Sequence, residues 1–565
     1  MQSKVVKKPA GRLVSVAFAV GLAAGCGGGG GGGSDSPALP DPPPTAQPPP
    51  TPDPPTSTAP ELTSGERFSG GAAGTSASNE QAFSKAPPAI EADFTDDANF
   101  KSGNAIFRND HEGQGPVLNA ATCQGCHVRD GRGIVPPNQQ TPFDSMFLRL
   151  SVGSDADGNP IPDPSYGTQL QTFGAASFNG NDITVGLSSF GGGTTEAIGE
   201  AFAFIEYEEV PGAYPDGETY SLRMPTYKVR ELSYGDFVDG IQFSPRVAQQ
   251  MIGLGLLGAI PEADIRALAD PDDADSDGIS GRVNESFDPT TESLELGRYG
   301  YKATSASVLQ QTAGAYRGDM GVTSRFATEE PCAANQASCI AAAMLEPDPH
   351  PGAVDISDLE LALVEFYGRL LAVPDRRGYN ADTDTWDADI VAGREHFFDA
   401  GCGACHAHSF ETSTAAGSVL GEISLSTLTP DAPPIDVLSN QTIFPYTDLL
   451  LHDMGGSCQP VAREDADGNV CNAGDNCIYV LRCEGLADGR PDRLASGTEW
   501  RTAPLWGLGL VQTVSPAATF LHDGRARTIE EAVLWHGGEA QTARDAFSNL
   551  PAAERARMLA FLESL

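Results

Sequence analysis

The sequence predicts a mainly α protein with two domains of one type, a large intervening region carrying a minor β insertion, and a disordered N-terminal tether. Three observations predict this class: a repeat of helix-spaced apolar residues, one strong hairpin signal, and a Gly- and Pro-rich beginning. The repeat consists of Phe100, Gly103 and Phe107 before Cys123–His127, and of Ile390, Gly393 and Phe397 before Cys402–His406. A helix is therefore expected before each cysteine motif.

The hairpin signal lies in the intervening region. Two runs, 202–210 and 218–229, are joined through Pro215-Asp216-Gly217, a typical turn sequence. A helix is expected to begin near Ser357, and the apolar face of 552–565 predicts a closing helix.

The N-terminus has the features of an export signal. A positively charged start precedes the apolar run 13–24, which is too short to span a bilayer. The following Gly25-Cys26 resembles the cleavage site of bacterial lipoproteins, in which the cysteine is acylated. We expect a lipoprotein-type signal peptide over 1–25 and a periplasmic or outer-membrane protein that is lipid-anchored through Cys26; a simple secreted form is the alternative.

Composition divides the rest of the chain. Glycine-rich and then proline-rich sequence predicts a tether over 26–85. We expect an N-terminal domain over 86–385, which includes the β and helical region, and a C-terminal domain over 386–565. The second domain carries a cysteine-rich insertion at 457–485.

Both cysteine motifs have the attachment pattern of c-type haem. Two thiols one helical turn apart add to the haem vinyl groups, and the histidine directly after them reaches the iron. A four-cysteine zinc site usually joins neighbouring pairs, and a thioredoxin-type Cys-x-x-Cys does not require the histidine. We therefore expect two cytochrome c-like domains, each with one covalently bound haem c. The haem-binding residues are Cys123, Cys126, His127, Cys402, Cys405 and His406, of which His127 and His406 coordinate the iron.

The charge of the chain is strongly negative. It has 76 Asp and Glu against 35 Lys and Arg, a net charge of −41. Nucleic acids and anionic membranes would be repelled, so we expect neither as a ligand, and the membrane is reached only through the lipid anchor. A small basic redox protein that donates or accepts electrons fits this charge.

Six of the 11 cysteines remain after the two motifs and Cys26 are set aside. In an exported protein this even number favours disulfides. Cys332 and Cys339 form an easy local pair. The other four crowd into the insertion and allow three connectivities. We expect them to staple a loop that has no core of its own; metal binding is the alternative. They are Cys458, Cys471, Cys477 and Cys483.

An acidic segment has the spacing of a calcium loop. Asp273, Asp275 and Asp277 alternate before Gly278, but the twelfth position is Asn284 instead of Glu. Bound calcium and a solvated acidic turn both fit this pattern.

Four strings carry a resemblance to a known family. They are Arg-Asp-Gly-Arg-Gly at 129–133, Pro-Tyr-Thr-Asp-Leu-Leu-Leu-His-Asp-Met-Gly at 445–455, Glu-Trp-Arg-Thr at 499–502 and Phe-Leu-His-Asp-Gly-Arg-Ala at 520–526. Together with the cysteine motifs they resemble the di-haem oxidoreductases also catalogued as thiol oxidoreductases. These are distant relatives of bacterial di-haem cytochrome c peroxidase and of the MauG enzymes. The likeness covers about 94–565, and the chain departs from it in the insertion and in lacking the peroxidase Phe-Trp-Asp-Gly-Arg string.

The resemblance also suggests iron ligands. In the bacterial peroxidases the axial methionine follows a Leu-Glu-x-Ala-Val-type helix, and here His536 occupies that place. We expect His536 to be the sixth ligand of the C-terminal haem. For the N-terminal haem, Met146 and His111 are candidates, and an open sixth position is the alternative. His452 and Met454 are expected near the edge of the C-terminal haem.

Three functions fit these observations. The first is an exported di-haem oxidoreductase that couples electron transfer to peroxide reduction or to the oxidation of an unknown substrate. The alternative is a pure electron-transfer cytochrome with both haems six-coordinate. In the third, the cysteine-rich insertion is a docking element. The sequence identifies no catalytic residue.

Overall fold

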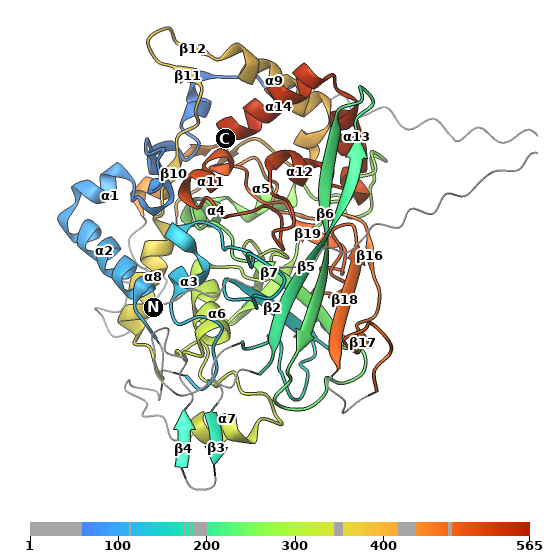
Figure 1. Cartoon of the computed structure of the whole chain (residues 1–565). Helices are drawn as coiled ribbons and strands as arrows, with labels where there is room; N and C mark the ends of the chain where they lie inside the picture. The colour runs from blue at the N-terminus through green and yellow to red at the C-terminus, as the bar shows by residue number, and fades with distance from the viewer. Residues whose placement is uncertain are drawn as a thin grey trace, which may run out of the picture. The chain divides into compact units, whose positions relative to one another are not determined.

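The fold combines helices with many small sheets, so it is mixed and the expectation of a mainly α protein is wrong (Figure 1). The computed structural model describes residues 59–111, 115–172, 200–343, 354–415, 435–472 and 477–565, and the backbone of 176–179 and 182–185. The expected signal peptide, Cys26 and the first part of the tether lie outside the described residues.

The largest sheet joins the predicted hairpin to the cysteine-rich insertion (Figure 1). Its strands run in the order β16-β18-β6-β5, and β17 also pairs with β18. Their bounds are β5 (Phe202–Ala213), β6 (Thr219–Arg230), β16 (Ser457–Cys458), β17 (Ala462–Glu464) and β18 (Ile478–Glu484). The hairpin prediction is confirmed, with Ala213 opposite Thr219 at the turn.

The insertion was expected to be a loop without a core of its own, and this is corrected by β18. Tyr479 and Leu481 of β18 are buried in one apolar cluster with Tyr227 of β6. The sequence of Ile478–Glu484 provides the physical reason, because it places Tyr479, Leu481 and Cys483 on one face of the strand, where they pack against neighbouring residues of the sheet.

The first repeat helix is α2 (Phe94–Arg108), which crosses α8 (Asp358–Arg369). Asp93 caps α2 by accepting hydrogen bonds from the backbone N–H groups of Thr95 and Asp96. A Cβ atom at Gly103 would collide with the Leu363 carbonyl, so glycine allows the two helices to approach closely. The helix α8 begins after Ser357, as the sequence predicts. The structure adds a capping box at this helix start.

The second repeat helix, α9 (Ala388–Asp399), crosses α14 (Ala552–Ser564) in the same manner (Figure 1). Here a Cβ atom at Gly393 would collide with the carbonyl of Arg557. The two glycines of the repeat therefore have one structural role, and the repeat is real although the fold class is mixed.

Residues 59–85, expected to continue the tether, are folded onto the rest of the chain. Phe83 is fully buried, and Glu66 pairs with Arg376 and Arg394 in the interior. The expectation of a disordered segment does not hold for these residues, because an apolar ring and a paired carboxylate fix them.

Other elements complete the described chain. The helices are α1 (Pro88–Ala92), α3 (Cys123–Cys126), α4 (Leu254–Ala259), α5 (Glu262–Arg266), α6 (Val308–Met320), α7 (Ala337–Ala343), α11 (Val511–Val514), α12 (Ile529–Leu534) and α13 (Gln541–Asn549). Short 3-10 helices are η1 (Ser64–Arg67), η2 (Gly71–Ala73), η3 (Ala82–Ser84), η4 (Val128–Asp130), η5 (Cys402–Ala404), η6 (Asp436–Leu438), η7 (Leu508–Leu510) and η8 (Gly538–Ala540). None of the described helices is both long and apolar enough to cross a membrane.

The remaining strands form two-stranded sheets. These are β1 (Gly74–Thr75) with β10 (Val373–Pro374), β2 (Met146–Ser151) with β7 (Gln242–Val247), β3 (Ala176–Asn179) with β4 (Asp182–Val185), β8 (Glu285–Asp288) with β9 (Ser293–Leu296), β11 (Tyr379–Asn380) with β12 (Thr385–Trp386), β13 (Phe410–Glu411) with β14 (Thr442–Ile443), and β15 (Leu451–Asp453) with β19 (Glu499–Arg501). Only β1 and β10 among these described pairs run parallel.

Candidate haem-attachment sites

The first cysteine motif forms the short helix α3. Thr122 caps it by accepting a hydrogen bond from the Gly125 backbone N–H at 3.0 Å. His127 follows directly, and its Nδ1 donates to the carbonyl oxygen of Gln249 at 2.8 Å. A carbonyl only accepts, so Nδ1 carries the proton and Nε2 keeps its lone pair for a metal. The Phe107 ring lies 6.2 Å from that of His127.

The second motif repeats this arrangement. Gly401 adopts a positive φ of 87° at the start of η5, which carries Cys402. His406 donates from Nδ1 to the carbonyl oxygen of Tyr446 at 2.9 Å. The Phe397 ring lies 6.1 Å from that of His406, the counterpart of the contact between Phe107 and His127. Each motif therefore presents an oriented imidazole backed by a phenylalanine from its own repeat helix.

The electrostatics of both motifs keep their groups neutral. Burial raises the pKa of Cys123 and of Cys402 to about 12. Burial also lowers the pKa of His406 to about 4. In each motif a neutral imidazole with a free Nε2 follows two free cysteines, and this combination fits the covalent attachment of haem.

The described cysteines divide as the sequence predicts. Cys332 pairs with Cys339, Cys458 with Cys483, and Cys471 with Cys477. Among the cysteines of the described residues, the four of the two motifs are the free ones. The structure thus selects one of the three connectivities of the insertion, and its strand pairing explains the choice because Cys458 lies opposite Cys483 in β16 and β18.

His536 lies just beyond the end of α12, which begins after the N-cap Thr528. Its Nδ1 donates to the carbonyl oxygen of Ala532 at 2.7 Å, so its Nε2 also keeps a lone pair. Besides burial, the presence of His536 lowers the pKa of His406, so the two imidazoles lie within electrostatic range of each other.

His452, which the sequence placed near the C-terminal haem edge, lies 3.6 Å from Cys405 Sγ through its Nδ1 atom. Its two ring nitrogens face Asp448 and Glu539. Sequence reasoning missed both carboxylates as its partners. Asp448 lies four residues before His452 in the same family string, so the sequence could have suggested it as a partner. Glu539 is distant in sequence, and no sequence pattern connects it to His452.

The two candidate ligands of the N-terminal haem are both buried, and the His111 backbone N–H donates to the Ala121 carbonyl, two residues before Cys123. Met146 is buried in the apolar cluster around β2, with Phe143 and Leu148. His111 is buried with its ring 5.2 Å from that of Tyr316. Met320, which the sequence did not suggest, lies beside the motif: its Sδ atom is 4.0 Å from Cys123 Sγ.

The acidic segment gathers a slightly different set from the one predicted. Ligand atoms of Asp270, Asp273 and Asp275 lie within 4.8 Å of one another. Asp277 is outside this group and accepts from the Ile279 backbone N–H at 2.8 Å. Asp270 was missed because it precedes the alternating pattern.

A buried aromatic layer follows the strand pair β15 and β19. His452 lies opposite Trp500 in the register, and the Trp500 ring stacks on His522 with centroids 3.9 Å apart. The His522 carbonyl accepts from Val247, two residues before the Gln249 that holds His127. This layer therefore extends from His452, beside Cys405 of the second motif, to the strand that leads to Gln249 at His127 of the first motif.

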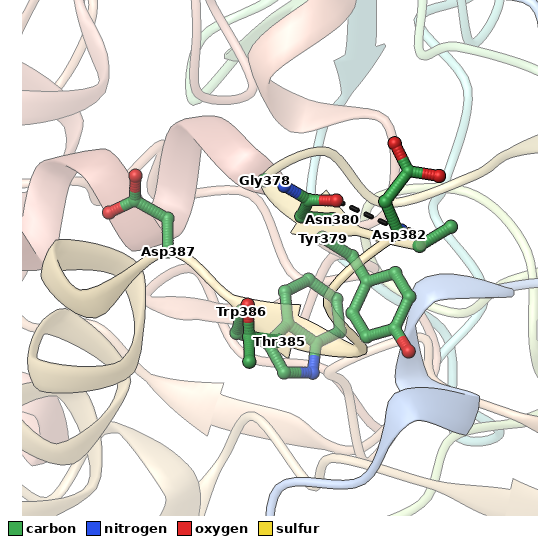
Figure 2. A pocket seen from close by; sticks show the side chains of 8 residues that line it. Gly378, Tyr379, Asn380, Asp382, Thr385, Trp386 and Asp387 are labelled. Carbon is green, nitrogen blue, oxygen red and sulfur yellow. Dashed lines mark hydrogen bonds between the residues drawn. The ribbon is translucent and has the colours of Figure 1, made fainter.

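The surface also has an open pocket at the hairpin β11–β12 (Figure 2). The Tyr379 and Trp386 rings meet edge to face there, with centroids 5.2 Å apart. The Trp386 Nε1 donates to the Thr63 carbonyl, and polar side chains also line the pocket. Its lining is Gly378, Tyr379, Asn380, Ala381, Asp382, Thr385, Trp386 and Asp387.

Comparisons with known proteins agree with the two motifs. The sequence matches the family described as "Di-haem oxidoreductase, putative peroxidase" over residues 56–474 and 475–565. Among curated proteins, none matches the chain significantly. The solved structures that match include hydrazine synthase of Kuenenia stuttgartiensis pressurised with 20 bar xenon, at 17% identity. That match covers 38% of this chain and 57% of the other chain with a TM-score of 0.21, which is too low to define a fold.

The break in the family match, between residues 474 and 475, falls inside the cysteine-rich insertion. The matched residues otherwise include both cysteine motifs and all four strings that carry the resemblance. Membership of this family indicates a haem-based redox function for the chain. The chain belongs to the di-haem oxidoreductase family.

Proposed function

We propose that this chain is an exported c-type di-haem oxidoreductase, with one haem attached covalently at each Cys-x-x-Cys-His motif. The observation that carries the proposal is the paired geometry of His127 and His406. Each histidine donates Nδ1–H to a backbone carbonyl and is backed by a phenylalanine of its repeat helix. Such a hydrogen bond fixes the tautomer and makes the other nitrogen a better iron ligand.

The residues of the C-terminal site would hold the iron from two sides. His406 would bind as the proximal ligand and His536 as the sixth, since both keep Nε2 unprotonated. A haem bound in this way supplies an iron that takes up and releases single electrons. Two imidazole ligands would make this a low-potential centre, suited to relaying electrons.

The N-terminal site would be the place of substrate chemistry. His127 would supply one ligand, and an open sixth position would admit peroxide or another small substrate. Phe107 backs the proximal imidazole, and the buried Met320 borders the attachment cysteine Cys123.

The surroundings of such an enzyme are proposed from charge and sequence. A net charge of −41 would attract a small basic redox protein as donor or acceptor. A lipid on Cys26 would keep the protein at the outer membrane, facing the periplasm. Calcium at Asp270, Asp273 and Asp275 is a separate proposal, tested by calorimetric titration with and without Asp273→Asn.

The decisive experiment counts haems and their spin states. Protein produced with haem-maturation machinery should give two haems per chain in a pyridine haemochrome assay. The double variants Cys123→Ala/Cys126→Ala and Cys402→Ala/Cys405→Ala should each retain one. A wild-type count of one or none would refute the proposal. In EPR spectra, a high-spin N-terminal iron supports the enzyme, whereas two low-spin six-coordinate irons indicate the electron-transfer cytochrome.

A further inference from the structure

His452 occupies a buried position between two carboxylates and a haem-attachment cysteine. Its Nδ1 lies 2.8 Å from Glu539 Oε2, and its Nε2 lies 2.8 Å from Asp448 Oδ2. The same Nδ1 is 3.6 Å from Cys405 Sγ. The side chain is almost fully buried, with 3% of its surface exposed.

This geometry determines the charge of the ring. Ionised carboxylates only accept hydrogen bonds, so both ring nitrogens must donate and the imidazole must carry two protons. Burial alone would lower the pKa of His452, but its hydrogen bonds, with Asp448 foremost and Glu539 among them, overcome this and raise the pKa well above its usual range. Hydrogen bonds to His452 likewise act against burial and lower the pKa of Glu539.

The surrounding elements hold the ring in place. The backbone of His452 is paired with Trp500 in β15 and β19. Glu539 is fixed by a hydrogen bond from the Ser280 hydroxyl at 2.6 Å. A Cβ atom at Gly281 would lie 3.0 Å from His452 Cε1, so the backbone at Gly281 covers the ring edge between the nitrogens. The cation therefore has little freedom to turn away or to be screened by water.

We infer that His452 is a fixed imidazolium that raises the reduction potential of the C-terminal haem, and that Asp448 and Glu539 hold it in this role. The inference rests on the proposed function, because the sulfur beside His452 is the one through which that haem would be attached. His452 is a positioning and electrostatic residue and does not itself bind the iron. Oxidised haem carries one more positive charge than reduced haem, so a nearby cation disfavours the oxidised form.

The cluster allows this to be tested in both directions. Its three groups, Asp448, His452 and Glu539, sum to one negative charge. His452→Gln removes the cation and makes the cluster more negative, so the midpoint potential should fall. Glu539→Gln removes one anion, keeps an acceptor for the Nδ1–H, and should raise the potential. A role in packing alone would not move the potential in opposite directions in the two variants.

The measurement is a spectroelectrochemical titration of the holoprotein at pH 7. The wave of the C-terminal haem is identified by its loss in Cys402→Ala/Cys405→Ala, and the N-terminal wave should stay fixed as the internal reference. A fall in His452→Gln with a rise in Glu539→Gln supports the inference. Unchanged potentials, or shifts of the same sign, overturn it.

Haem counting separates this inference from the function on which it rests. A wild-type protein without covalent haem removes the proposed function and the inference together. Two haems in the wild type with unshifted potentials overturn the inference alone. If His452→Gln no longer attaches the haem, Glu539→Gln decides by itself, and the absence of a rise overturns the inference.

Discussion

His536 donates its Nδ1–H to the carbonyl oxygen of Ala532, one helical turn earlier, at 2.7 Å. This bond orients the ring and leaves Nε2 available. We expect His536→Ala to convert the low-spin signal of the C-terminal haem into a high-spin one, as seen by EPR. His536→Met should keep the iron six-coordinate and raise its midpoint potential, because a thioether donates less to ferric iron than an imidazole does. A low-spin signal that survives in His536→Ala would show that another residue is the ligand.

Glu66 should be important for stability. Its carboxylate binds Arg376 and Arg394 at 2.9 Å each, and it is buried with 1% of its surface exposed. Glu66→Gln leaves two buried guanidinium groups without their anion, so we expect a loss of about 3–5 kcal/mol in the free energy of unfolding. The matched control is Glu80→Gln, which breaks an exposed pair with Arg129 and should cost at most about 1 kcal/mol. Urea unfolding followed by circular dichroism measures both, and equal losses would contradict the expectation.

Six cysteines should resist alkylation. Mass spectrometry without reductant should find Cys332, Cys339, Cys458, Cys471, Cys477 and Cys483 unlabelled, because all six are paired. Peptide mapping should recover the pairs 458–483 and 471–477. Cys458→Ser should expose a thiol at Cys483 alone, and labelling at Cys471 or Cys477 in that variant would mean a different connectivity.

Acid should destabilise the protein partly through His522. Burial lowers the pKa of this histidine to about 4, whereas an unfolded histidine titrates near 6.5. The unfolded state therefore binds the proton first, and stability falls as the pH decreases from about 6.5 to about 4, by up to about 3 kcal/mol. Urea unfolding at several pH values should show a flatter dependence in His522→Gln. Burial also lowers the pKa of His408 to about 4, so part of the slope should remain. An unchanged slope would contradict this role.

Cys26→Ser should move the protein from the membrane fraction to the soluble periplasm, because the acylated sulfur would be its anchor. The residue after Cys26 is Gly27 and not the aspartate that often retains lipoproteins at the inner membrane, so the wild type should fractionate with the outer membrane. Cys332→Ser, which leaves the N-terminus intact, is the control. Identical fractionation of Cys26→Ser and the wild type would argue against lipidation.

The repeat helices show what a local pattern can predict. Apolar spacing around Gly103 and Gly393 predicted two helices, and both are present as α2 and α9. The same spacing could not show that each glycine faces the backbone of another helix, because α8 and α14 come from distant parts of the chain. The periodicity of a helix reports its buried face but not its partner.

The fold class was missed for a related reason. Ile478–Glu484 has the local pattern of a strand, but the four cysteines of the insertion suggested a stapled loop. Its partner β6 ends at Arg230, far earlier in the sequence, so no local pattern could show the pairing. The site shows the same limit. His452 could be placed near Cys405 from the family string, whereas Glu539 could be joined to it only through the tertiary structure.

The pairing of β6 with β18 has a consequence for the order in which the chain can fold. The hairpin β5–β6 is formed by neighbouring segments, so it can close before the distant Ile478–Glu484 reaches it, and until then the outer backbone edge of β6 lacks its hydrogen-bonding neighbour. An open strand edge is a template for association with other chains. Chains truncated before residue 478 should therefore aggregate more readily than full-length chains when both are diluted from denaturant, because only the full-length chain contains β18.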